Sequence, residues 1–491
     1  MKTGVRKQTL VVLLKFTPLV LFALLVILFK MDLLLAAPIA TFCAIVVYMV
    51  VCKASFEQAF EQGLTSARKI IVVLFILMFA YGTAECFMAT GVGAALINLA
   101  LRLGVTARSV ALVSMIVTCL LSIATGTSWG TFAACAPIFL WLNHLVGGSV
   151  LLTVCCIAGG SCFGDNIGMI SDVTVLSCGM QDVKIIDRLK HQLAWAFGCL
   201  FLACGIVMIA SISLPSTQGD VYAAIAQIPQ EARDSLQAER PSALLLLEQV
   251  ERGMPYYMIV PLILVIVLSF MGLHTLICLG VGMISSLFFG MFAGTVTPEM
   301  WLENLLLTGF SDAGSWTVVM MLWVSAFGGI MNSMNAFEPL ENLVVRHSCS
   351  IRQLMGWCGV MCLAGNMALA DETAQVTTIS PIVRDIVDKN VECADEEANY
   401  TLRLRLATFT SAMGIYGSEL VPWHCFPVFF ASIANAVYPL HSFSTMEIIG
   451  KNYLSFIIVG SILFLTFTGW DRFVPGFGLP DKSRVKLRSN N

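Results

Sequence analysis

The sequence predicts an all-α polytopic membrane protein with two inverted-topology repeats, broken helices and re-entrant hairpins. Three observations lead to this fold class. Of the 491 residues, 58% are hydrophobic and 12% are charged, and the mean hydropathy is +0.85. A soluble domain carries about 25% charged residues. Apolar runs long enough to cross a bilayer recur along the chain, and similar segments follow one another in the same order in two halves.

The apolar runs divide around one polar segment. Residues 214–253, rich in Ala, Gln and Glu, predict an extracytoplasmic linker with helical character. We expect a first transmembrane repeat at 1–213, a second at 254–470 and a basic cytoplasmic tail at 471–491. The predicted spans are 9–29, 33–52, 68–85, 106–124, 149–162, 188–213, 254–271, 272–293, 315–334, 353–369, 406–417 and 449–469.

Two pairs of segments indicate the internal repeat. Residues 17–35 resemble 260–278, and residues 60–82 resemble 306–328. The second pair keeps a constant offset, because 309 − 63 = 246 and 328 − 82 = 246. The shared order and spacing support a repeat more strongly than any single match between apolar segments.

Further along the chain the same offset pairs GTSWGT at 126–131 with ETAQVT at 372–377. An insertion near DKNVECADEEANY then shifts the register. After it, FGDNIGMISD at 163–172 pairs with YGSELVPWHC at 416–425, where 417 − 164 = 253.

The distribution of basic residues predicts that the repeats are inverted. Lys and Arg favour the cytoplasmic side of a membrane. They occur at both ends of the chain and after the second span, whereas the counterpart loop at 294–314 has none. We therefore expect cytoplasmic termini, with the 214–253 linker outside. Inverted repeats around broken helices are typical of secondary transporters.

Composition and missing motifs exclude other classes. The net charge is −3, so no basic surface predicts nucleic-acid binding. The 17 cysteines lie mostly in apolar runs without a paired CxxC pattern. The sequence contains no GxxxxGK[ST], HExxH or GxSxG, so we predict neither a pump nor an enzyme, and no resident cofactor. The expected partners are the lipid bilayer and small cations or a small organic solute, with a homodimer as one option.

The first broken element is LLSIATGTSWGTFAACAPIF at 120–139. Gly126 and Gly130 loosen the helix, and Pro137 interrupts its hydrogen-bond ladder. Freed carbonyls and hydroxyls here could coordinate a small cation; the alternative is helix packing by small residues, with hydroxyls bonded back to the i−4 carbonyl. The candidate hydroxyls belong to Thr127, Ser128 and Thr131.

The second broken element is SCFGDNIGMISDVTVLS at 161–177. A carboxylate at the bilayer centre costs at least ~3 kcal/mol, so one that is kept there is expected to pair with a cation or a proton. The alternatives are that Ser171 or Asp172 caps a helix and that Asp165 lies at the membrane edge. The candidate residues are Asp165, Asn166, Ser171, Asp172 and Thr174.

The second half offers related segments. LAGNMALADETAQVTTISPIV contains Asp371, Glu372 and Thr373, and its acidic pair is alternatively explained as charge at a helix N-terminus. MGIYGSELVPWHCFPVF contains the candidates Ser418, Glu419 and His424.

Glu419 pairs by position with Asn166. His424 is either a satisfied core residue, or a proton carrier or substrate contact. Asp165, Asp172 and Glu419 are the predicted sodium ligands. Glu85 is expected at a re-entrant turn.

Three segments together resemble the NhaC family of sodium/proton antiporters: GTSWGT at 126–131, GGSCFGDNIGMISDVTVLS at 159–177 with the following RLKHQ, and GSELVPW at 417–423. The resemblance implies an inverted-repeat fold with re-entrant hairpins, elevator-like movement and a multi-pass bacterial inner-membrane (plasma-membrane) protein. The chain differs from the family pattern at two places. Asn166, Ile167 and Gly168 stand where the family has Lys-Ser-Pro, and Glu419 is a carboxylate that the family pattern lacks.

Two functions follow as hypotheses. The first is exchange of sodium, or another monovalent cation, for protons, with an acidic side chain alternating between the two ions. The second is sodium-coupled transport of an amino acid or organic acid, because some members of the family resemble carriers of such solutes. In that case His424 and Asn166 would contact the substrate.

Overall fold

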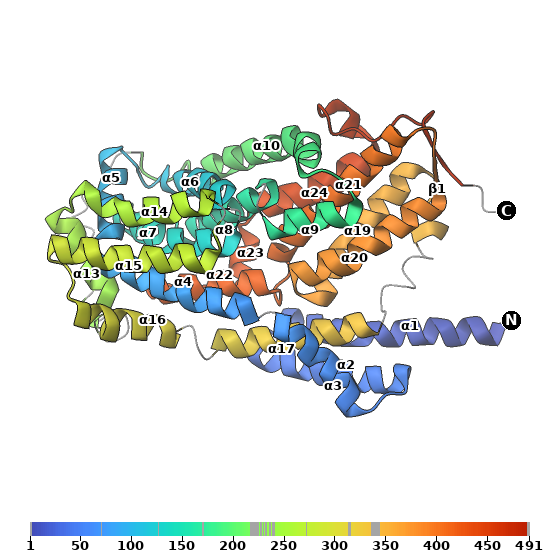
Figure 1. The fold of residues 1–491 in the computed structure, drawn as a ribbon, viewed down its shortest axis with the longest axis horizontal. Coiled ribbons are helices and arrows are strands. Elements are labelled where there is room, and N and C mark those ends of the chain that lie inside the picture. Colours follow the sequence, from blue (N-terminus) through green and yellow to red (C-terminus); the bar gives the residue numbers. More distant parts are fainter. Residues whose placement is uncertain are drawn as a thin grey trace.

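The computed structural model of the chain is almost entirely helical, and most of its long helices run along the long axis of the molecule (Figure 1). Apart from a few single positions between 225 and 237, the structure describes residues 2–69, 71–125, 127–168, 171–216, 241–271, 273–312, 316–334 and 344–488. Within them, five helices are long and apolar enough to cross a membrane, and seven spans result if each of two sharply bent helix pairs counts as one. The predicted all-α multi-pass fold is confirmed.

Several helices of the first half lie at predicted spans, but the helix at Ser128–Val146, which is long and apolar enough to cross a membrane, is not among those predicted. α2 has the predicted bounds, and α1 continues into a short π-helical turn at Leu24–Leu28. α4 and α5 form one of the bent pairs, with an angle of 66° at Gly91. The helices are α1 Lys2–Ala23, α2 Leu33–Cys52, α3 Phe56–Lys69, α4 Ile71–Thr90, α5 Val92–Arg102, α6 Val110–Thr125, α7 Ser128–Val146, α8 Val150–Ile167, α9 Asp172–Gln181 and α10 Ile185–Ala210.

The second half repeats this order of long and broken helices. Its bent pair consists of α21 and α22, at 49°, with a 3₁₀ turn (η4, Ser418–Leu420) between them. The elements are η2 Tyr256–Ile259, α14 Val260–Phe270, α15 Thr275–Ala293, η3 Met300–Leu306, α16 Leu307–Asp312, α17 Trp316–Ser333, α19 Ile351–Leu369, α20 Glu372–Asn390, β1 Val391–Cys393, α21 Glu396–Ile415, α22 Cys425–Val437, α23 Thr445–Gly450, α24 Tyr453–Thr468, η5 Trp470–Phe473 and β2 Val485–Leu487.

Contacts between the halves are reciprocal. α7 packs on α22 and α9 packs on α20; α3 packs on α17 and α16 packs on α4. In the order of the elements, α7 corresponds to α20, α9 to α22, α3 to α16 and α4 to α17. Each contact therefore has a mirrored partner, as expected for two repeats related by a pseudo-twofold axis.

The direction of the chain shows that the repeats are inverted. Both termini lie at one end of the molecule, and the linker helix α13 (Pro241–Arg252) lies at the opposite end (Figure 1). α1 starts at the end that holds the termini, whereas its counterpart α14 starts beside α13. The two halves therefore run in opposite directions along the long axis, as the distribution of Lys and Arg predicts.

The end of the linker is a docked helix. α13 packs against α4 and α5, and its buried side chains recur at helical spacing. Gln249 donates a hydrogen bond from its amide to the carbonyl of Ala89. Most of residues 217–240, within the predicted 214–253 linker, lie outside the described residues.

The helices before and after each break approach closely. Ser122 on α6 donates to the carbonyl of Ser161 on α8, and Asn366 on α19 donates to the carbonyl of Gly414 on α21 at 3.1 Å. The two acceptors keep the predicted offset, because 414 − 161 = 253. A Cβ atom at Gly164 would overlap the backbone of α6, so glycine is needed for this approach.

Candidate functional site

Cys162, in the second half of α8, lies within electrostatic range of three of the predicted carboxylates. The sulfur of Cys162 lies close enough to Glu419, Asp165 and Glu372 for each carboxylate to influence its electrostatic environment. Asp165 comes from the end of α8, Glu372 from the start of α20 and Glu419 from η4. The candidate site is therefore the place where broken helices of both halves meet.

Asp165 caps the N-terminus of α7 from a neighbouring helix. Its Oδ2 accepts hydrogen bonds from the backbone N–H of Ser128 at 3.2 Å and from the Ser128 hydroxyl at 2.8 Å. Asp165 is 4% exposed, so it is buried between the helices. The partial positive charge at a helix N-terminus stabilises an anion in this position. Asp165 thus links the N-terminus of α7 to the end of α8.

Thr131, another predicted hydroxyl of the first break, has a local partner. Thr131 donates to the carbonyl of Thr127 at 2.8 Å, which is the i−4 arrangement given above as the alternative to cation binding. Both threonines also line a small cavity of about 20 Å³ between α7 and α14–α15. Gly126 lies outside the described residues.

Ser171 caps α9 by accepting a hydrogen bond from the N–H of Thr174 at 3.3 Å. The Thr174 hydroxyl lies 3.4 Å from the carbonyl oxygens of Asp165 and Asn166, which ties the start of α9 to the end of α8. Asp172 is the first residue of α9, but its side chain lies outside the described residues. Its role as a sodium ligand stays a prediction.

Asn166 is the centre of a buried polar network that joins the two halves. Its Oδ1 accepts hydrogen bonds from Arg188 on α10 and from Ser411 on α21, both at 2.9 Å. Its carbonyl accepts from Gln192 at 3.0 Å. Its Nδ2 has no hydrogen-bond partner among the described residues. The break after α8 is therefore held by side chains from α10 and α21.

Arg188 is a fully buried cation that the sequence analysis missed. Its guanidinium donates to Thr174 at 3.0 Å, to Asn166 and to Gln192 at 3.2 Å, and it forms no ion pair with a described carboxylate. The i, i+4 spacing of Arg188 and Gln192 was the available signal, because both lie on the buried face of α10 whereas Lys190 is exposed.

Glu419 lies in the corresponding break of the second half and is 1% exposed. Its Oε2 accepts a hydrogen bond from the hydroxyl of Ser455 on α24, and the side chains of Asn452 and Cys162 lie beside the carboxylate. Its Oε1 accepts no hydrogen bond from the described residues, and none of their cations forms an ion pair with it. Ser455, Asn452 and Cys162 were not predicted, since no sequence spacing links them to Glu419.

The carboxylates at the start of α20 have different surroundings. Asp371 is the N-cap of the helix, and its Oδ1 accepts from the N–H of Ala374 at 2.6 Å. Glu372 lies 3.5 Å from the indole nitrogen of Trp129 on α7, and Thr373 is exposed. The alternative of charge at a helix N-terminus therefore describes both residues, and Glu372 also contacts Trp129 of the first half.

Ser418 and His424 flank Glu419 in sequence and are both buried. The Ser418 hydroxyl donates to the carbonyl of Ile415. His424 caps α22, and its Nδ1 accepts from the N–H of Phe426 at 3.3 Å, so the proton of the neutral ring is on Nε2. That Nε2 has no partner among the described residues. His424 is thus a buried donor available to a ligand.

The described carboxylates do not form one chelating cluster. In the part of the chain that the structure describes, no three His, Cys, Asp or Glu side chains lie close enough together to hold a metal ion. Asp165 and Glu419 are separate positions around Cys162. A cation at either one would rely on a single carboxylate and on neutral oxygen ligands.

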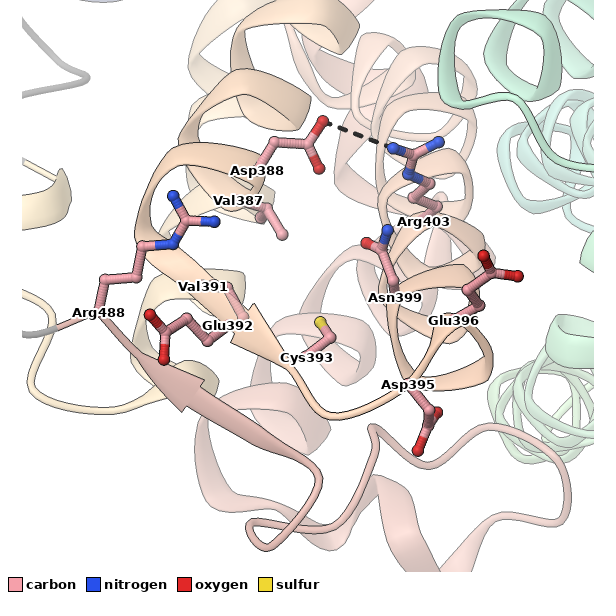
Figure 2. Close-up of a pocket in the computed structure, with 10 residues that line it drawn as sticks. All are labelled: Val387, Asp388, Val391, Glu392, Cys393, Asp395, Glu396, Asn399, Arg403 and Arg488. Carbon is pink, nitrogen blue, oxygen red and sulfur yellow. Dashed lines mark ion pairs between the residues drawn. The ribbon is translucent and has the colours of Figure 1, made fainter.

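A larger cavity lies away from these residues, beside β1. It measures about 690 Å³ and lies between the end of α20, β1 and the start of α21 (Figure 2). Asp388 and Arg403 form an ion pair across it at 3.6 Å. None of the predicted site residues lines it.

Comparisons with known proteins agree with the sequence motifs. The sequence model of the Na⁺/H⁺ antiporter family matches this chain over residues 6–209 and 160–470. The malate-2H⁺/Na⁺-lactate antiporter of Bacillus subtilis is 22% identical over 434 residues, 84% of each chain. The arginine/ornithine antiporter ArcD of Halobacterium salinarum is 22% identical over 370 residues, 72% of this chain and 69% of that one.

Two more distant proteins were found. The Na⁺/H⁺ antiporter NhaC of Alkalihalophilus pseudofirmus is 20% identical over 340 residues, 65% of this chain and 67% of that one. Among solved structures, the YdaH transporter of Alcanivorax borkumensis covers 86% of this chain and 90% of its own, with a TM-score of 0.37 and 13% identity. That likeness is too loose to describe the arrangement of the helices.

Proposed function

The chain belongs to the Na⁺/H⁺ antiporter family and is a secondary antiporter, and we propose that it exchanges sodium ions for protons at the carboxylate of Glu419. The observation that carries the proposal is the burial of Glu419 without an ion pair from any described cation. An ionised carboxylate in a dry interior needs a compensating cation; without one, it holds a proton. The same group can thus hold either ion but not both.

The neighbours of Glu419 suit both occupants. The Ser455 hydroxyl donates to the ionised carboxylate, and rotation of the hydroxyl turns its lone pairs towards a cation. The amide of Asn452 lies beside the carboxylate as a hydrogen-bond donor, because its Oδ1 already accepts from the N–H of Ser455, so the carboxylate and the Ser455 hydroxyl are the oxygens offered to a cation. Oxygen ligands of this kind are those that hard cations prefer. Ser455 therefore supplies an oxygen ligand of the proposed sodium site from α24, and Asn452 supports the ionised carboxylate as a donor.

Asp165 has a different proposed role. Its Oδ2 already accepts two hydrogen bonds from Ser128 at the N-terminus of α7. Hydrogen bonds to the ionised form favour that form, so Asp165 stays negative while Glu419 changes its occupant. Asp165 then supplies a constant negative potential that attracts the sodium ion into the region around Cys162.

A second candidate function is exchange of an organic solute, and His424 is the observation that favours it. A buried Nε2–H without a described acceptor suits a carboxylate of a substrate, and the unpartnered Nδ2 of Asn166 offers a second donor. The relatives named above include antiporters for malate and lactate and for arginine and ornithine. In this case sodium at Glu419 would be the coupling ion.

Flux measurements on proteoliposomes separate the two functions. Gradients of sodium, lithium and potassium are imposed, and internal pH is read with a dye. The proposal expects sodium-dependent proton flux without any organic solute. Proton movement that requires malate, lactate, arginine or ornithine on the opposite side would favour the second function, and absence of both activities would refute the proposal.

A further inference from the structure

A cavity with a cationic lining lies where the C-terminal tail folds back onto the helices. It measures about 490 Å³ and is formed by the start of α19, the end of α24 and tail residues between 479 and 487. Arg352, Lys482 and Lys486 line it, and no carboxylate does. The cavity belongs to the end of the molecule that holds both termini (Figure 1).

The three cations have no ion-pair partner among the described residues. Arg484, which lies between the two lysines in sequence, contrasts with them, because it binds Asp395 at 2.7 Å and Glu397 at 2.6 Å. Glu392 is the cross-strand neighbour of Lys486 but forms no ion pair with it. The tail is thus anchored through Arg484, and its two lysines remain available to an anion.

The position of Arg352 is defined by close packing. Its guanidinium lies against Gly469, which ends α24 with a φ of 78°, and a Cβ atom there would overlap it. Its positive charge therefore lies at the C-terminus of α24 and at one wall of the cavity.

Part of the remaining cavity lining is apolar, and exposed aromatic rings lie nearby. Phe467 and Leu479 line the cavity itself. Trp357 packs edge-on against Phe467 at 5.8 Å. Beyond the end of α24, Trp470 is 55% exposed and Phe473 is 69% exposed. Exposed aromatic rings at the ends of apolar helices mark the level of the lipid headgroups.

We propose that this cavity binds the phosphate of an anionic phospholipid, with the acyl chains lying along the apolar surface of α24. Three cations without a compensating carboxylate attract a phosphate, and each Lys or Arg near an anionic membrane surface contributes to such binding. The ligand is a lipid because apolar side chains and exposed aromatic rings adjoin the cations. The inference does not depend on the ion that the protein transports.

Native mass spectrometry of the full chain in detergent tests this site. Phosphatidylglycerol should bind with a defined stoichiometry, and phosphatidylcholine should bind much more weakly. The Lys482→Gln/Lys486→Gln variant should bind phosphatidylglycerol about 30-fold more weakly, because two cations are removed. The matched variant Lys53→Gln/Lys190→Gln removes two exposed lysines outside the cavity and should retain wild-type affinity.

The thermal midpoint of each variant without lipid shows that it is folded. Equal binding of phosphatidylglycerol to the wild type and to the Lys482→Gln/Lys486→Gln variant would overturn the proposal. If the Lys53→Gln/Lys190→Gln variant lost as much phosphatidylglycerol affinity, the proposal would also be overturned, because binding would then depend on the net charge of the protein and not on this cavity. If glycerol phosphate binds with the same affinity as the lipid, the ligand is a soluble phosphate ester and the lipid assignment is wrong.

Discussion

Replacing Glu419 by Gln should abolish exchange while the fold is preserved. The substitution keeps the shape of the side chain and its contact with the Ser455 hydroxyl, so thermal stability should change by no more than about 1 kcal/mol. Removing the charge lowers the affinity for sodium strongly. Two unit charges 4 Å apart attract by about 4 kcal/mol at an effective dielectric constant near 20, which corresponds to about a thousandfold change in affinity.

The assay is sodium-driven proton flux in proteoliposomes, with Glu248→Gln as the matched control. Glu248 is exposed on α13, and its ion-pair partner among the described residues is Arg252, so its loss should leave the flux unchanged. The Glu419→Gln protein should give the flux of protein-free liposomes at every pH. Wild-type flux in a Glu419→Gln protein of normal stability would refute the assignment of Glu419.

Three further predictions test the supporting structure. Gly164→Ala should lower the thermal midpoint sharply because its Cβ would overlap the backbone of α6, whereas Gly198→Ala, with open space around it, should not. Arg188→Lys loses the guanidinium fork and should destabilise the fold by about 2 kcal/mol in thermal unfolding; an unchanged midpoint would contradict this. Arg484 hydrogen-bonds Asp395 and lowers the pKa of Asp395, so this anchoring is present at neutral pH and is lost as the pH falls through that lowered pKa. Amide hydrogen exchange in β2 should therefore be faster in the Arg484→Gln variant than in the wild type at pH 7, and equal in the two proteins in acid. A difference between the two proteins that persists in acid would contradict this anchoring role of Arg484.

The sequence was sufficient for the architecture because the fold follows from patterns that repeat. A broken-helix, inverted-repeat protein is predicted by the length of the apolar runs, by the uneven distribution of Lys and Arg, and by the 246- and 253-residue offsets between similar segments. The structure agrees, because the contacts between the two halves are reciprocal. The docking of α13 could also have been predicted. Its buried residues follow an i, i+3, i+4, i+7 pattern that ends in Leu247 and Val250.

The sequence was less informative about the site because its contacts are long-range. It identified Asp165 and Glu419 as carboxylates at helix breaks, but not that Asp165 caps α7 or that Ser455 on α24 binds Glu419. Residues from α8, η4 and α24 meet only through tertiary packing. Glu85 was expected at a turn and instead lies buried within α4, because the chain bends at Gly91, six residues later.

The most direct test of the central claim is proton release when sodium is added to the purified protein in a weakly buffered solution, read by a pH-sensitive dye. If sodium and a proton compete for Glu419, the wild type releases protons on sodium addition, and the Glu419→Gln protein releases none. Release of the same size from the Glu419→Gln protein, or no release from an active wild type, would contradict the account.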